Sequence, residues 1–189
     1  MNDTVTNNKG SIKKSMNLNK NQLINQANKI IASKYPDFIL DSLLYDITAW
    51  KNSKKTIVNY KRIIRFTPLD KKDLNLAYDI EVDLNDQIVF PFDTWGLDKF
   101  YIPTIEEQEK IDFVIKAFGL QRLRLEFNNN IVETPDMYCI YMDNEVAFGK
   151  YFIDKTTGKE CIGSIEGSYT QPPDIPEFLD KDPLIEIKE

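Results

Sequence analysis

The sequence predicts an α+β fold, in which a curved antiparallel sheet packs against two main helices. Two segments carry apolar residues at helical spacing, and several others alternate apolar and polar residues as half-buried strands do. The helices and strands come in blocks and do not alternate one by one, which is typical of α+β proteins. One helix followed by strands occurs twice along the chain, which indicates two degenerate helix-plus-strands repeats.

Composition divides the chain into three parts. Residues 1–18 are rich in Asn, Lys, Thr and Ser and have little to bury, so we expect a flexible leader there. Residues 19–170 are predicted to form a single α+β domain, because a chain of 189 residues suffices for one well-buried core. Residues 171–189 are a predicted Pro-rich acidic tail, which either wraps around the domain or hangs free.

The first predicted helix covers residues 19–34. Leu23, Ala27 and Ile31 recur at the spacing that makes one apolar stripe on a helix. Pro36 disfavours helical geometry at the residue before it, so the helix should end near Lys34.

The second predicted helix covers residues 104–118 and has the strongest local signal in the chain. Thr104 and Glu107 form a capping box, in which each side chain accepts a hydrogen bond from the backbone N–H of the other residue. Gly119 suits a positive φ just beyond the helix end.

Strands are predicted where β-branched, aromatic or alternating residues dominate. Residues 76–84 alternate most clearly and should have one buried and one exposed face. Tight turns are expected at Asn85-Asp86 and Asp143-Asn144, each joining two strands in a hairpin. The predicted strands are residues 56–66, 76–84, 87–92, 120–127, 137–142, 145–153 and 160–166.

The residue types present limit the chemistry that this chain can perform. It has no histidine, which excludes Ser-His-Asp, Cys-His and His-bound metal catalysis. Carboxylate, Lys, Tyr or oxygen-bound Mg²⁺ catalysis remains open, but no catalytic constellation is evident, so we expect neither enzyme activity nor a cofactor. Cys139 and Cys161 form no CxxC pair and are predicted to be free thiols on neighbouring strands. With no signal peptide and no long apolar run, a cytoplasmic location is predicted.

Charge is distributed unevenly along the chain. Residues 1–75 hold 14 Lys or Arg and 6 Asp or Glu, a net charge of +8, whereas residues 76–189 hold 10 and 24, a net charge of −14. Such asymmetry either marks an acidic surface for a basic partner or is neutralised when the two parts fold together.

An acidic stripe follows the alternating strand. Asp79, Glu81 and Asp83 occupy its polar positions, and Asp86 follows in the turn. Their oxygens could bind Mg²⁺ or Ca²⁺, but alternate positions on one strand lie about 6–7 Å apart and do not focus on one ion. A solvated face is the simpler interpretation, and recognition of a basic partner is its functional form.

Two further segments have binding potential. The segment FPFDTWGLDKFYIP holds more aromatic area than a linker needs, and Trp95 and Tyr101 are therefore candidate binding residues, with core packing as the alternative. The strand 56–66 interleaves basic and aromatic residues, as single-strand nucleic-acid sites do. The acidic net charge of −6 argues against nucleic-acid binding.

The segment YFIDKTTGK, from Tyr151 to Lys159, contains a predicted turn with Gly158 at positive φ. Together with the order of helix and antiparallel strands, it resembles the cystatin-like and nuclear-transport-factor-like domains among small bacterial immunity proteins of polymorphic toxin systems. In those domains an Asp-x-x-T-G turn often closes the sheet, and Asp154, Thr157 and Gly158 match it. The resemblance covers the second half best, transfers no functional residue, and implies an antitoxin-like role in which the chain binds a cognate toxin.

The sequence therefore favours a non-enzymatic protein-binding domain, most concretely an immunity protein that neutralises a toxin with a basic surface. One alternative is a small-ligand-binding protein or enzyme that uses a pocket enclosed by the curved sheet, with Tyr78, Asp79 or Glu126 as its polar groups. Another is an adaptor that forms homo-oligomers through an exposed sheet edge. The predicted partner-binding residues are Asp79, Glu81, Asp83, Asp86, Trp95 and Tyr101.

Overall fold

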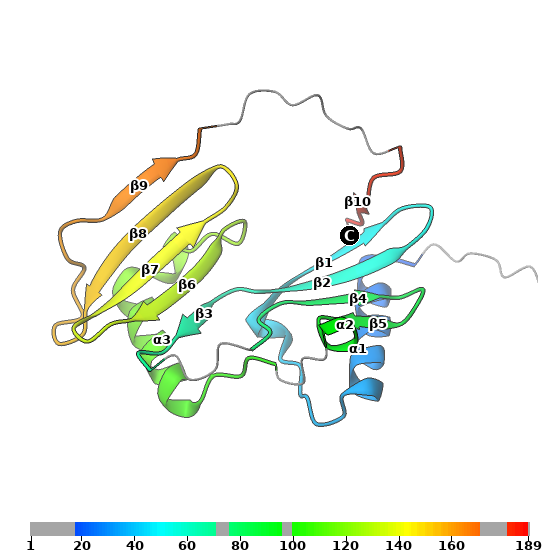
Figure 1. Cartoon of the computed structure of the whole chain (residues 1–189), viewed down its shortest axis with the longest axis horizontal. Helices are drawn as coiled ribbons and strands as arrows, with labels where there is room; N and C mark the ends of the chain where they lie inside the picture. Colours follow the sequence, from blue (N-terminus) through cyan, green and yellow to red (C-terminus); the bar gives the residue numbers. More distant parts are fainter. Residues whose placement is uncertain (1–17, 71–75, 96–99, 171–180, 189) are drawn as a thin grey trace, which may run out of the picture.

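The computed structural model describes residues 18–70, 76–95, 100–170 and 181–188 and has the predicted α+β class (Figure 1). The strands form two five-stranded sheets, not one continuous curved sheet. Each sheet is associated with one long helix, and the two resulting units lie side by side (Figure 1). Residues 1–17 of the predicted leader and most of the predicted tail lie outside the described residues, whereas Leu18, the last residue of the predicted leader, packs against the first core.

The first unit consists of helix α1 and a sheet with the strand order β10-β1-β2-β4-β5. All of its neighbouring strands pair antiparallel. Its elements are α1 (Lys20–Lys34), a short 3-10 turn (Ser42–Leu44), β1 (Tyr45–Lys51), β2 (Thr56–Arg62), β4 (Ile80–Asp83), β5 (Ile88–Phe90), α2 (Phe92–Trp95) and β10 (Ile185–Glu186).

The second unit consists of helix α3 and a sheet with the strand order β3-β6-β7-β8-β9. Strand β3 pairs parallel with β6, and the other neighbours pair antiparallel. Its elements are β3 (Arg65–Thr67), α3 (Ile105–Phe118), a 3-10 turn (Leu120–Arg122), β6 (Asn128–Glu133), β7 (Met137–Asp143), β8 (Ala147–Asp154) and β9 (Ile165–Ser168).

The two units repeat one arrangement of elements. In each, a helix precedes four antiparallel strands that pair in chain order: β1, β2, β4 and β5 in the first unit, and β6, β7, β8 and β9 in the second. The first strand of each series also pairs with a strand from elsewhere in the chain, which is β10 for β1 and β3 for β6. The order expected for a degenerate duplication is therefore present in three dimensions.

Local signals explain both long helices. The predicted capping box of α3 is present, with the Thr104 N–H donating to Glu107 at 2.8 Å and the Glu107 N–H donating to Thr104 at 3.2 Å. Gly119 follows at a φ of 96°, a positive value as predicted. Helix α1 has a second capping box, between Asn19 and Gln22, which the sequence analysis did not identify.

Each unit has its own hydrophobic core. Apolar residues of the helix stripe meet alternate residues of the facing strands, which is the pattern that amphipathic elements produce. The first core contains Leu23, Ala27, Ile31, Tyr45, Ala49, Val58, Tyr60, Ala77, Ile80, Val82, Val89, Phe92 and Phe100. The second contains Phe66, Tyr101, Ile111, Val114, Phe118, Phe127, Ile131, Tyr138, Ile140, Met142 and Ile153.

Arg62 lies at the junction of the two cores. It ends β2 and is only 4% exposed, and its guanidinium carbon lies 5.4 Å from the ring centre of Tyr45 and 5.2 Å from that of Tyr101. Its Nε donates to the carbonyl of Ile64 at 3.1 Å. The chain then leaves the first sheet and enters the second as β3, so the single strand predicted for residues 56–66 is wrong.

Other strand predictions need correction. Residues 120–127 form a 3-10 turn and a loop, and the strand begins at Asn128. The buried Asn129 amide holds that loop, donating to the carbonyls of Arg124 at 3.0 Å and Phe127 at 3.3 Å. Strand β4 begins only at Ile80, β9 begins only at Ile165, and the sequence analysis did not predict β1 or β10.

The hairpin between β7 and β8 is confirmed, and Gly158 has the positive φ predicted for the following turn, 64°. Both cysteines are free, although Cys161 lies outside any named strand and donates its N–H to Phe152 of β8. Within the described part of the tail, β10 pairs with β1. None of the helices in the described residues is long and apolar enough to cross a lipid bilayer.

Candidate functional site

The face of the first sheet opposite the first core carries polar and aromatic side chains. Thr48, Asn59, Glu81 and Phe90 stand directly opposite one another on β1, β2, β4 and β5, and so form one row across the sheet. Residues directly opposite on antiparallel strands point to the same side, and the intervening positions on these strands supply the core.

A groove with a volume of about 730 Å³ lies over this row. One wall is the sheet, and the other is the loop that leads into β6 of the second unit, where Leu125, Glu126 and Asn128 border the groove. Lys61 donates from Nζ to the carbonyl of Leu125 at 3.1 Å, which links the two walls. The other lining residues are Asp46, Thr48, Trp50, Asn59, Tyr60, Asp79, Ile80, Glu81 and Phe90.

Aromatic side chains lie around Glu81 on this face of the sheet. Trp50 stands opposite the buried Ile57 and donates from Nε1 to the Thr48 hydroxyl at 2.9 Å, which orients the indole on this face. Phe90 meets Trp95 edge to face with ring centres 4.7 Å apart. Trp95 is 70% exposed. Its role as a partner-binding residue stays a prediction.

The carboxylates of the predicted acidic stripe have different partners. Asp79 accepts from the Arg62 backbone N–H at 2.9 Å and forms an ion pair with Arg65. Asp83 accepts from the backbone N–H groups of Asn85 at 2.8 Å and Asp86 at 3.3 Å, and so holds the turn after β4. Asp86 is exposed in that turn.

Glu81 is the member of the stripe that remains available. It lies at the centre of the row, and among the described residues it has no ion-pair partner. Asp46 and Glu126 add two further carboxylates to the lining of the groove. We call this surface, with Trp50, Phe90 and Trp95, the acidic-aromatic groove.

Tyr101 is not a surface residue, which corrects its assignment as a partner-binding side chain. It is 2% exposed in the second core, with its ring centre 4.7 Å from that of Tyr78. Burial raises the pKa of its hydroxyl well above the usual range. Core packing, the alternative considered for this segment, therefore describes Tyr101, whereas Trp95 at the other end of the segment is exposed.

The groups proposed for a catalytic pocket do not converge. Asp79 and Glu126 both line the groove, but Tyr78 does not, and its hydroxyl donates to the carbonyl of Phe66 at 3.2 Å. Within the residues that the structure describes, no group of three or more Cys, Asp or Glu side chains is arranged to hold a metal ion.

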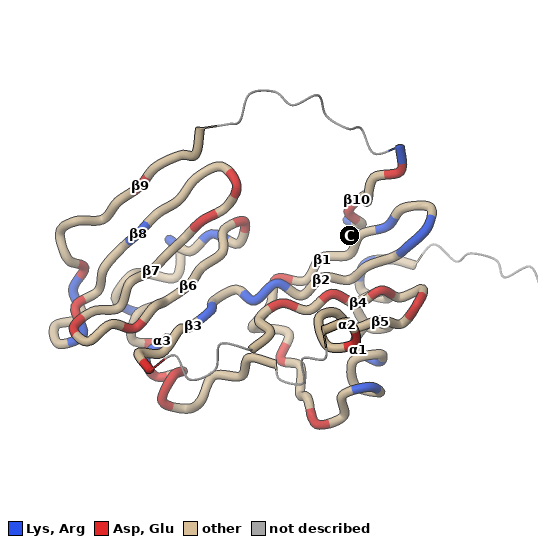
Figure 2. The backbone as a smooth tube through the Cα atoms, in the orientation of Figure 1, with Lys and Arg blue, Asp and Glu red and all other residues tan. Residues whose placement is uncertain are grey.

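Basic residues of the first half neutralise some of the acidic second half (Figure 2). Lys34 pairs with Asp93 at 2.6 Å, and the Tyr35 hydroxyl donates to the same carboxylate at 2.7 Å. Burial alone would raise the pKa of Asp93, but the hydrogen bonds from Lys34, Tyr35 and the Val89 N–H lower it. Asp93 and Asp79 are thus paired, whereas Asp46, Glu81 and Glu126, the other carboxylates that line the groove, have no ion-pair partner among the described residues.

The sequence analysis missed the contribution of β1. Residues 45–51 alternate in the same way as 76–84, with Tyr45 and Ala49 buried and Thr48 and Trp50 on the groove side. That alternation was the signal that could have placed Trp50 on the same face as Glu81.

Comparisons with protein-family models, curated proteins and solved structures found no match to this chain.

Proposed function

We propose that this chain is a non-enzymatic protein-binding domain, most concretely an immunity protein that neutralises a cognate bacterial toxin by direct binding. The observation that carries the proposal is the acidic-aromatic groove, in which Glu81 has no ion-pair partner among the described residues and lies beside the half-buried Trp50 and Phe90, with the exposed Trp95 packed on Phe90. The sequence resemblance of the Asp154 turn to immunity proteins supports the same class.

The groove has the two components that protein recognition uses. Trp95 and Trp50 supply large, rigid aromatic surface, which commonly dominates the energy of binding interfaces. Glu81, Asp46 and Glu126 supply negative charge, which speeds association with a basic partner and disfavours acidic ones. A basic loop or strand of the toxin would place its Lys or Arg side chains on these carboxylates.

A second candidate function is small-ligand binding, with or without catalysis. The groove volume of about 730 Å³ lies within the range of ligand pockets, and the groove has a partly apolar lining. The two functions differ in the size of the molecule bound, so the mass of the complex formed in solution distinguishes them.

The test uses the full chain and the protein encoded by the gene immediately upstream, mixed at equal concentrations. We expect a stable complex by light scattering and a dissociation constant measurable by calorimetry. Glu81→Gln should weaken binding at least about tenfold, because a charge is lost from the interface centre. Trp95→Ala should weaken it about 30-fold, the effect of removing an interface anchor.

Two variants serve as controls. Glu145→Gln changes an exposed carboxylate in the turn after β7, and Leu43→Ala removes an exposed apolar side chain that is 84% accessible, and both should bind normally. The proposal is wrong if the neighbouring protein does not bind, or if the control variants weaken binding as much as the groove variants do.

A further inference from the structure

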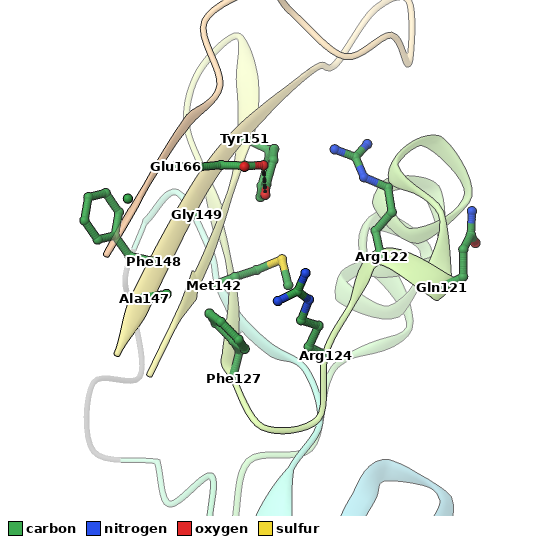
Figure 3. Close-up of a pocket in the computed structure, with 11 residues that line it drawn as sticks. Gln121, Arg122, Arg124, Phe127, Met142, Ala147, Phe148, Gly149, Tyr151 and Glu166 are labelled. Carbon is green, nitrogen blue, oxygen red and sulfur yellow. Dashed lines mark hydrogen bonds between the residues drawn. The ribbon is translucent and has the colours of Figure 1, made fainter. Parts of the chain in front are cut away.

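A second hollow, of about 430 Å³, lies on the other unit between the helix-facing side of β8 and β9 and the loop after α3 (Figure 3). It shares no lining residue with the acidic-aromatic groove. Its floor is formed by the apolar side chains of Phe127 and Met142, which are 8% and 5% exposed. Gly149 stands directly opposite Met142, and the Tyr151 side chain packs closely over it, since a Cβ at this position would lie 2.9 Å from the Tyr151 ring and hydroxyl.

Three charged side chains line this hollow, with Glu166 beside the Tyr151 hydroxyl and Arg122 and Arg124 on the loop opposite (Figure 3). The hydroxyl donates to Glu166 of β9 at 2.6 Å. Burial raises the pKa of Tyr151, and the bond to Glu166 raises it further, whereas the positive charges of Arg122 and Arg124 lower it. The sheet thus presents a carboxylate, and the loop after α3 presents two guanidinium groups.

The two arginines are not equivalent. Arg122 is committed to the fold, because it forms two hydrogen bonds with Glu160, at 2.6 Å and 3.3 Å, and stacks 3.8 Å from the ring centre of Phe118. Arg124 has no ion-pair partner among the described residues, and its guanidinium carbon lies 5.6 Å from the ring centre of Phe127. Among the described residues, the charges of the hollow without an ion-pair partner are therefore one cation, Arg124, and one anion, Glu166, whose Oε1 accepts from the Tyr151 hydroxyl.

We infer that this hollow binds a small zwitterion of the α-amino acid class, with its carboxylate on Arg124 and its ammonium group on Glu166. The planar guanidinium matches a carboxylate with two parallel hydrogen bonds. An apolar side chain of the ligand packs on Phe127 and Met142, and the volume suits a molecule of this size. A simple anion meets repulsion from Glu166, and a simple cation meets repulsion from Arg124.

Three matched probes test this inference with the full chain. L-phenylalanine carries both charges, 3-phenylpropanoate lacks the ammonium group, and 2-phenylethylamine lacks the carboxylate. Amide chemical shifts of the ¹⁵N-labelled protein locate each probe, and their titration measures its affinity. We expect saturable binding of L-phenylalanine with shifts around Gly149 and Glu166, and binding of each of the other probes at least about tenfold weaker.

Two substitutions then remove one charge each. Arg124→Gln should weaken the binding of L-phenylalanine about tenfold, to the affinity that the unmodified chain has for 2-phenylethylamine. Glu166→Gln should weaken it to the affinity that the unmodified chain has for 3-phenylpropanoate. Arg124→Lys keeps the positive charge but loses the two parallel hydrogen bonds of the guanidinium. Its affinity for L-phenylalanine should therefore lie between those of the unmodified chain and Arg124→Gln. Lys116→Gln and Glu109→Gln, on the exposed side of α3, should bind like the unmodified chain.

The inference is overturned if L-phenylalanine does not saturate, if the three probes bind equally, or if the shifts map to the acidic-aromatic groove. Because no residue is shared between the two sites, failure here leaves the proposed protein-binding function standing. Loss of toxin binding in the Glu81→Gln variant equally leaves this site untouched.

Discussion

Glu133 is the carboxylate on which the second unit most depends. It ends β6 with its side chain 6% exposed, and it accepts from Lys155 at 2.8 Å, from Lys110 at 3.2 Å and from the Leu69 N–H at 3.3 Å. One carboxylate therefore joins α3, the turn after β8 and the segment after β3 to the end of β6. Removing its charge by Glu133→Gln tests how much this junction contributes to stability.

The expected loss in the free energy of unfolding is about 2–3 kcal/mol. Breaking a buried ion pair by removing one partner typically costs about 3–5 kcal/mol, because the other charge is left uncompensated. Here both lysines keep a second partner, since Lys110 also pairs with Glu106 at 2.9 Å and Lys155 also donates to the carbonyl of Thr134 at 2.9 Å. The glutamine can still accept one hydrogen bond, so the expected loss lies at or just below the lower end of that typical range.

The effect should depend on pH in a defined direction. Burial alone would raise the pKa of Glu133, but the hydrogen bonds from Lys155, Lys110 and the Leu69 N–H lower it below its usual value. A group whose pKa is lowered on folding stabilises the protein fully above its unfolded pKa, about 4.3, and this contribution is lost as the pH falls through the folded pKa. The difference between the parent chain and Glu133→Gln should therefore shrink below about pH 4.

Urea unfolding at pH 7 and pH 3 provides the assay. Far-UV circular dichroism reports both units, whereas fluorescence reports the first unit, because the only two tryptophans, Trp50 and Trp95, lie there. Glu109→Gln, an exposed change on α3, is the control and should leave the midpoint within error. A loss below about 0.5 kcal/mol at pH 7, or an equal loss at pH 3, would refute the reasoning.

Four other predictions concern single contacts. Asn129→Ala should cost about 2–3 kcal/mol in urea unfolding, because its amide donates to the Ile63, Arg124 and Phe127 carbonyls; an unchanged midpoint would contradict this. Thr104→Ala should lower the free energy of unfolding by about 1 kcal/mol through loss of the capping box, and Ser42→Ala, at a position that caps no helix, is the control. Gly158→Ala should lower the melting temperature by a few degrees, about 1 kcal/mol, because φ is 64° there. Binding of a basic partner to the acidic-aromatic groove should weaken as salt rises from about 0.05 to 0.5 M, and salt-independent affinity would argue against Glu81 as a contact.

Elements with local causes were predicted well. The capping box of Thr104 and Glu107 defines the start of α3 from residues three apart, and Gly119 defines its end. The β7 to β8 hairpin also has a local cause, because the Asn144 side chain accepts from the Val146 and Ala147 N–H groups at 2.9 Å and 2.8 Å. In such cases the residues that determine the structure are neighbours in the sequence.

The wrong strand at residues 120–127 shows where local pattern fails. Leu123, Leu125 and Phe127 do alternate with polar residues, but alternation shows only that a segment could pair, not that a partner strand is beside it. In the structure Arg122 binds Glu160, which is 38 residues away, and the carbonyls of the loop are taken by Asn129. Both contacts favour a loop over a strand, and the first is not visible in a local window.

The acidic stripe shows the same difference between local and long-range causes within the candidate site. Its alternation along β4 was correct for Glu81 and Asp83, but which carboxylate stays available depends on Arg65, which pairs with Asp79, and on β1 and β5, which place Trp50 and Phe90 around Glu81. Tyr101 was misplaced for a related reason, because an aromatic residue suits a core and an interface equally well until its neighbours are known.

The sequence by itself determined the α+β class, both long helices, the main hairpins and the exclusion of histidine-based chemistry, since each follows from residue types or from residues a few positions apart. Only the tertiary structure decided that the strands divide between two sheets, which side chains line the groove on the first sheet, and that Glu81 and Arg124 have no ion-pair partner among the described residues. Those features depend on pairing between residues tens of positions apart, where the net gain of one partner over another is a small difference between large free energies.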